Sequence, residues 1–118
     1  MIKRNLHTIE KQKVAAGKNT YMQMLISPKE GPNFAMRRFI IEAGGSMPLH
    51  TNLVEHEQLV LNGRAQVKIA EKVFEVQKDD VVLIPQGVPH SYKTIGNESF
   101  EFLCLVPNKE DKIEICKE

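Results

Sequence analysis

Short stretches rich in β-branched and aromatic residues recur about every ten residues along the chain, separated by single glycines, prolines and polar turns. Before the last ten residues, no stretch carries the apolar spacing of an amphipathic helix. The predicted strands cover residues 21–26, 34–42, 56–62, 64–70, 73–76, 81–84, 90–94 and 100–106. This regular spacing favours an all-β sandwich or barrel over alternating βαβ units.

The pair Asn62-Gly63 is the strongest local turn signal in the chain. Asn and Gly tolerate positive φ angles best, and a two-residue type I′ turn requires such angles at both positions. Apolar residues precede the pair, and Ala65, Val67 and Ile69 alternate after it. The sequence therefore predicts a tight β-hairpin that joins strands 56–62 and 64–70.

The two ends of the chain differ from this pattern. The first twenty residues are polar, with Ile2, Leu6 and Ile9 as isolated apolar anchors, so they have little reason to fold alone. We expect this arm to cover an open edge of its own sheet or of a partner's sheet. The segment Lys109–Glu118 is compatible either with a frayed helical turn or with an added strand.

Composition narrows the class of protein. With 118 residues the chain has the length of one domain, and 16 basic residues against 15 acidic ones give a net charge of +1 without a basic cluster. This balance argues against a nucleic-acid partner. No apolar run reaches the roughly 18 residues that cross a bilayer, so we expect a soluble, cytoplasmic protein with no membrane partner. Cys104 and Cys116 do not resemble a disulfide framework, and we expect reduced thiols.

Three of the four histidines stand at or beside predicted strand starts, namely His50, His56 and His90. In an extended strand His50, Asn52 and His56 share one face, provided that no bulge intervenes. Three neutral imidazoles would leave two or three coordination positions open on a divalent transition metal. Spacing alone also leaves open that these are ordinary packed histidines. His7, in the polar arm, is expected to be exposed.

Two segments resemble the motifs of the cupin family. The segment 44–63 resembles the first cupin motif, with His50 and Gly63 in place, and 79–94 resembles the second, with Pro85-x-Gly87-x-x-His90 intact. The fifteen residues between them match the short loop of small microbial cupins. The resemblance implies a double-stranded β-helix, or jelly-roll barrel, as a single cupin domain over residues 1–118, with an arm at 1–20.

The chain departs from the family's motifs at several positions. Asn52 replaces the usual second histidine, His56 the usual glutamate, Asp79 an opening glycine and Thr94 a closing asparagine. A histidine at position 56 is similar to a subgroup of cupins in which four histidines bind manganese or another divalent ion. The resemblance therefore implies metal ligands at His50, His56 and His90, with Asn52 as a weak fourth ligand or as a hydrogen-bond donor to metal-bound water. Glu57 competes as an acidic ligand, although it has the opposite strand parity.

Further residues are expected around this site. Without a carboxylate ligand the ion would keep its charge and attract carboxylates, enolates and peroxides. Tyr92 shares the face of His90, so it is either a proton donor or a packed core tyrosine. Predicted to line the substrate pocket are Gln58, Phe102 and Cys104, the last as an oxidisable thiol or a plain buried cysteine. One of Arg37 and Arg38 must point inward, where it would anchor a substrate carboxylate.

The resemblance implies a metal-dependent oxygenase-type enzyme, similar to cupin dioxygenases, that acts on a small organic substrate. The expected cofactor is one divalent ion, Mn, Fe, Cu, Ni or Zn. Alternatives are a metal-dependent isomerase or lyase, a non-catalytic module that binds a metal or a small molecule, and a degenerate barrel without metal. A homodimer is expected because small barrels leave a flat sheet face and a free arm.

Overall fold

The computed structural model describes residues 1–117 and contains almost only β-structure. One 3-10 turn, η1 (Leu6–Thr8), precedes the strands. The strands are β1 (Gln12–Lys13), β2 (Lys18–Ile26), β3 (Phe34–Thr51), β4 (His56–Asn62), β5 (Arg64–Ile69), β6 (Lys72–Gln77), β7 (Val81–Ile84), β8 (His90–Ile95), β9 (Phe100–Pro107) and β10 (Glu114–Ile115). All the strands predicted from the sequence are confirmed. No helix within residues 1–117 has the length and hydropathy that a bilayer crossing requires.

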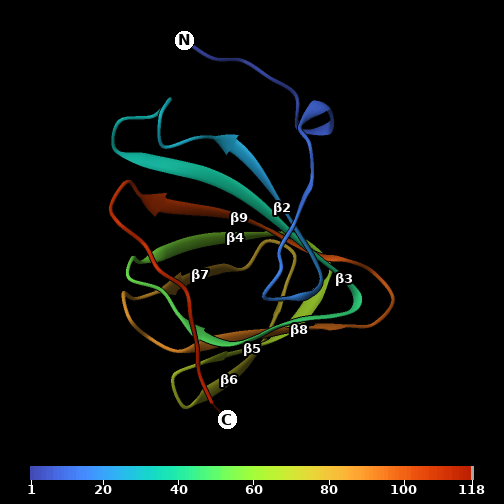
Figure 1. Ribbon diagram of the computed structural model, residues 1–118. Helices are drawn as coiled ribbons and strands as arrows, with labels where there is room; N and C mark the ends of the chain where they lie inside the picture. The colour runs from blue at the N-terminus through green and yellow to red at the C-terminus, as the bar shows by residue number, and fades with distance from the viewer. Residues whose placement is uncertain (118) are drawn as a thin grey trace.

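The sheet curls into two layers because β3 is long enough to belong to both (Figure 1). Its first half pairs with β2 and β9, and its second half pairs with β8 and β10. The strand order is β6-β5-β8-β3-β9-β4-β7, with all pairs antiparallel. The core lies between the layers, and the predicted all-β jelly-roll barrel is confirmed.

Strand β3 is longer than the sequence predicts. It was expected to end at residue 42 but continues to Thr51. Gly44 has a φ of 78°, a backbone conformation that glycine adopts without steric cost, so the strand passes it without a side-chain clash. Gly45 follows with no room for a Cβ, which would lie 2.7 Å from the carbonyl oxygen of Lys18. These two glycines continue the strand into the second layer and bring His50 into the sheet.

The hairpin predicted at Asn62-Gly63 is wrong. β4 and β5 are not partners: β4 pairs with β7 and β9, whereas β5 pairs with β6 and β8. Only Gly63 of the pair has a positive φ, 73°, so the turn is not type I′. Instead, the pair is a corner at which the chain changes layer. The side chain of Asn62 donates to the carbonyl of Ser99 at 2.9 Å and holds the corner against the start of β9.

Asp79 stands where the second motif has a glycine, and its φ is 78°, a backbone conformation that glycine adopts without steric cost. This backbone conformation costs an L-residue about 1 to 2 kcal/mol of steric strain. Glycine has no such strain, and its only cost is the greater conformational entropy that it loses on folding. We expect Asp79→Gly to raise the free energy of unfolding by about 0.5 kcal/mol, measured by urea denaturation. Asp80→Gly, the control, should lower it because the carboxylate of Asp80 accepts from the backbone of Gln77 at 2.9 Å. A destabilised Asp79→Gly variant would contradict this account.

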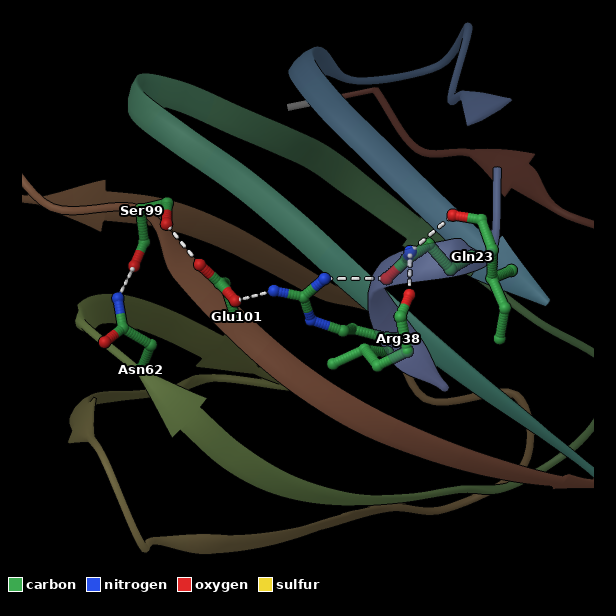
Figure 2. Close-up of polar contacts among 7 residues, drawn as sticks. Gln23, Arg38, Asn62, Ser99 and Glu101 are labelled. Carbon is green, nitrogen blue, oxygen red and sulfur yellow. Dashed lines mark hydrogen bonds and ion pairs between the residues drawn. The ribbon is translucent and has the colours of Figure 1, made fainter. Parts of the chain in front are cut away.

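The N-terminal arm covers the edge of its own sheet, one of the two alternatives that the sequence left open. β1 pairs with β2 at the sheet edge. The buried Gln23 of β2 donates from its amide nitrogen to the carbonyls of Leu6 at 3.0 Å and Ile9 at 2.8 Å. Its amide oxygen accepts from Arg38 at 2.6 Å, and Arg38 also pairs with Glu101 (Figure 2). The arm is therefore tied to a polar network that crosses β2, β3 and β9.

The C-terminal tail runs from the end of β9 across the near side of the barrel toward the other layer (Figure 1, red). It adds the two-residue strand β10, which pairs with β3 at Thr51 and His50. This confirms the added-strand alternative for the tail. Cys104 and Cys116 are unpaired, in agreement with the expected reduced thiols.

Candidate metal centre

One cavity of about 360 Å³ collects most of the residues that the sequence singled out. Both layers of the barrel, the arm and the tail contribute to its wall. Its lining consists of Val14, Met22, Arg37, Phe39, Met47, His50, Asn52, His56, Gln58, His90, Tyr92, Phe102, Asp111 and Ile113. Four of the lining groups are the predicted metal ligands, so the sheet brings together residues that are up to forty positions apart in the sequence.

His50 and His90 face each other across the paired strands β3 and β8. Their ring centroids lie 4.1 Å apart. The Nδ1 atom of His50 lies 2.7 Å from the carbonyl of Pro48, and that of His90 lies 2.9 Å from the carbonyl of Val88. Since a carbonyl can only accept, both Nδ1 atoms carry the proton, and Nε2 is left as the atom with a free lone pair. This is the tautomer that metal binding through Nε2 requires.

His56 enters the cavity from β4, with its ring centroid 5.8 Å from that of His90. Nε2 of His56, Nε2 of His90 and Oδ1 of Asn52 are all buried and have no hydrogen-bond partner. A buried polar atom without a partner costs about 1 to 3 kcal/mol, so several such atoms in one cavity are available to bind a ligand. Within residues 1–117, no group of three or more His, Cys, Asp or Glu side chains is arranged so that it could hold a metal ion. The donor atoms are of the types that bind transition metals, but the side chains would have to move to coordinate one ion together.

The three imidazoles are held neutral. Burial lowers the pKa of His56 to about 3, assisted by the charges of Arg37 and His90. Burial also lowers the pKa of His90 to about 4, although the hydrogen bond from its ring to the carbonyl of Val88 raises this pKa. Burial lowers the pKa of His50 as well. Neutral imidazole is the form that binds metal, so protons compete little with a cation at neutral pH.

These shifts predict how the metal-free protein responds to acid. Unfolded histidine has a pKa of about 6.5, so below that pH the unfolded chain binds protons that folded His56 and His90 reject. Stability is therefore expected to be complete above about pH 6.5 and to fall as the pH decreases toward 4. Urea denaturation of chelator-treated protein from pH 7.5 to 4.5 measures this. His56→Gln should show a smaller slope, and an equal slope would contradict the assignment.

Asp111 is a site residue that the sequence did not reveal. One carboxylate oxygen accepts from the backbone of Leu53 at 2.8 Å, and the other lies 3.4 Å from the amide nitrogen of Asn52. Its negative charge opposes the lowering of the pKa of His50 and His56. The site predicted without a carboxylate ligand therefore has one carboxylate beside Asn52. No sequence signal pointed to Asp111, because it lies on an irregular tail segment that only the fold brings to the cavity.

The predicted pocket residues divide into two groups. Gln58 and Phe102 line the cavity, whereas Cys104 is fully buried and does not. Gln58 donates to the hydroxyl of Tyr92 at 2.8 Å, and burial raises the pKa of Tyr92, so this phenol keeps its proton. Burial also raises the pKa of the Cys104 thiol, which favours the plain buried cysteine over a reactive one. Glu57 is exposed, away from the cavity, and is no longer a candidate ligand.

The consecutive arginines of β3 point to opposite faces. Arg37 lines the cavity, and Arg38 points to the other face, where it joins Gln23 and Glu101. The alternation of side chains along a strand explains the division. The structure therefore identifies Arg37 as the inward arginine.

Comparison with known proteins adds to this geometry. A family model described as the cupin domain matches residues 37–106. The chain is 30% identical over 76 residues to an uncharacterized protein of Methanocaldococcus jannaschii, covering 64% of this chain and 61% of the relative. It is 29% identical over 80 residues to the 1-methylthio-D-xylulose 5-phosphate methylsulfurylase of Rhodospirillum rubrum, covering 68% of this chain and 51% of the relative. The matches thus span about half to three fifths of these curated relatives.

A similar solved structure is that of the polyketide cyclase RemF from Streptomyces resistomycificus, with a TM-score of 0.86 at 26% identity. The similarity covers 100% of this chain and 89% of the cyclase chain. The arm and the tail, which lie outside the family match, are therefore included in the structural likeness.

Proposed function

Since this chain belongs to the cupin domain family, we propose that its barrel holds one divalent transition metal ion and acts there on a small organic substrate. His50, His56 and His90 would hold the ion, with Mn, Fe, Cu, Ni and Zn as candidates. The observation that carries the proposal is the set of buried Nε2 atoms on His56 and His90, together with Oδ1 of Asn52, that have no partner in one cavity. When bound, such an ion supplies a Lewis acid that polarises an oxygen of the substrate.

The chain's own residues would bind and shield the substrate. Met22, Phe39, Phe102 and other apolar side chains line the cavity and exclude water from a bound molecule. Gln58 fixes the orientation of the Tyr92 hydroxyl. Because Tyr92 keeps its proton, it is suited to donate a hydrogen bond or a proton to substrate oxygen, not to act as a base.

An oxygenase-type reaction is the activity that we favour. This preference rests on the three-histidine donor set. Three ligands leave coordination positions open on the ion, and these positions suit a substrate and oxygen together. A metal-dependent isomerase or lyase is the alternative, since the methylsulfurylase and the polyketide cyclase bear names of other reaction types. A non-catalytic binding module is a further alternative, because this fold supports many functions. Asn52 argues against membership of the four-histidine manganese subgroup, because the chain has asparagine where that subgroup has a histidine ligand.

The first test is elemental analysis of the purified protein from cells grown without an excess of any one metal. We expect about one equivalent of transition metal per chain, and a screen for oxygen uptake and for isomerase activity follows. If the protein contains no metal and acquires none on dialysis against Mn(II), Fe(II) or Zn(II), the proposed function is wrong and a metal-free binding barrel remains.

The role of Asn52 can be tested by substitution. An amide oxygen is a weaker ligand than imidazole for these ions. If Asn52 contributes its oxygen, Asn52→Ala should weaken Zn(II) binding, while Asn52→His should strengthen it by about tenfold or more. Competition with a chromophoric chelator measures both. Equal affinities in all three proteins would show that position 52 lies outside the coordination sphere, with Asn52 only bonded to Asp111.

We also propose that the protein forms a homodimer. Val81, Leu83 and Leu59 are exposed on the paired strands β4 and β7, although such residues usually avoid water. Sedimentation equilibrium of the protein and of Leu83→Lys tests this proposal, since the charge should favour the monomer. Cytoplasmic localisation remains a prediction from the sequence.

A further inference from the structure

Arg37 places a positive charge in the cavity beside the histidines. In the sheet it lies opposite Cys104 of β9, which in turn lies opposite Gln58 of β4. Its charge is close enough to contribute to the lowered pKa of His56. The guanidinium and the candidate metal ligands therefore face the same space.

This guanidinium is not paired with an aspartate or glutamate among the described residues, although the carboxylate of Asp111 lines the same cavity. The other three arginines of the chain each pair with a glutamate: Arg4 with Glu30, Arg38 with Glu101 and Arg64 with Glu75. Arg37 forms no ion pair within residues 1–117. Its one hydrogen bond there is a weak contact from Nη2 to the sulfur of Cys104 at 3.5 Å, and its buried Nε has no partner.

The position of the guanidinium is fixed by aromatic packing. Its central carbon lies 5.0 Å from the centroid of the Phe39 ring, within the range of a cation–π contact. Phe39 in turn stacks on Phe102, with ring centroids 5.3 Å apart and an interplanar angle of 16°. A guanidinium held on an aromatic surface has lost much of its freedom before any ligand arrives, so little entropy is lost when it binds one.

We propose that Arg37 binds an oxyanion at one end of the cavity's ligand, a carboxylate or a phosphate group. Arginine presents parallel N–H donors that match both groups, and Arg37 has donors without partners to offer. The remaining wall of Val14, Met22, Met47 and the two phenylalanines suits an apolar or weakly polar body. The substrate class is therefore a small organic acid or phosphate ester. This inference rests on the proposed function, because it specifies the substrate of that same site.

Benzoate, phenyl phosphate and the neutral benzamide serve as probes, titrated calorimetrically into the protein as purified and after removal of metal by a chelator. In both forms we expect at least one of the two anions to bind and benzamide to bind much more weakly. Whichever anion binds better identifies the oxyanion that the site prefers. Arg37→Gln should weaken anion binding by about tenfold or more, since a charge-assisted hydrogen bond is lost. Arg37→Lys should retain part of the anion binding, because lysine keeps the positive charge but lacks the parallel N–H donors of the guanidinium.

The matched control is Arg64→Gln, which removes the same charge from an exposed ion pair and should leave anion binding unchanged. Metal content, measured on every sample, separates this inference from the proposed function. Loss of anion binding in Arg37→Gln with unchanged metal content supports the inference. A parent protein that is purified without metal and acquires none on dialysis, yet binds anions through Arg37, overturns the metal centre alone. Anion binding that survives in Arg37→Gln, or its absence from the parent, overturns the inference.

Discussion

His56→Ala is expected to weaken the binding of Zn(II) or Mn(II) by about a hundredfold or more. His56 is the proposed ligand on β4, and its Nε2 is one of the buried atoms without a partner. Structural zinc sites with four ligands bind with about 10 to 16 kcal/mol, so one ligand accounts for roughly 3 kcal/mol. Calorimetric titration of metal into the chelator-treated protein measures the affinity, and elemental analysis after dialysis measures the stoichiometry.

Two neighbouring substitutions are the controls for this experiment. Glu57→Ala changes the next residue of the same strand, whose side chain is exposed away from the cavity. His7→Ala removes an exposed histidine from the arm and tests for adventitious binding to a surface imidazole. Both variants should bind metal like the parent. A His56→Ala variant with parental affinity and stoichiometry would remove His56 from the site.

Gly63→Ala is expected to lower the free energy of unfolding by about 3 kcal/mol or more. Gly63 has a φ of 73°, which costs an L-residue about 1 to 2 kcal/mol. A Cβ at this position would also overlap the carbonyl oxygen of Ser99, a contact that only a backbone shift can relieve. Displacing well-packed backbone adds about 1 to 3 kcal/mol. Urea denaturation measures the loss.

Gly44→Ala provides the matched control, because it has the same backbone strain without the clash. Its φ is 78°, and a Cβ there would meet no atom within 4 Å. This variant should therefore lose only about 1 to 2 kcal/mol. Equal losses in the two variants would mean that the contact with Ser99 does not matter, and that the corner at Asn62-Gly63 tolerates movement.

Much of the fold was determined locally and was therefore readable in the sequence. Strands such as 56–62 and 81–84 were predicted with the bounds that the structure has, because β-branched residues and turn residues act within a few positions of the chain. The two histidine motifs also marked the residues that meet in the cavity. The break between two strands at Gly63 was also located correctly, since the conformational freedom of glycine is a local property, although the hairpin predicted there is wrong.

What the chain does at that turn was decided by the tertiary structure. A hairpin and a corner between layers have similar local sequences, and the choice depends on which strands β4 and β5 find as partners. The length of β3 has the same origin, because its second half is stabilised by pairing with β8 and the tail.

The candidate site shows the same division. His50, His56 and His90 were identifiable because their motifs are short and continuous in the sequence. Asp111 was not, since its place beside Asn52 depends on a tail that crosses the barrel after β9. Alternation along a strand required that one of Arg37 and Arg38 point inward, yet only the direction of the sheet's curl decided which. The sequence thus determined the strands and the imidazoles, while long-range pairing, which no local pattern encodes, determined the charges around them.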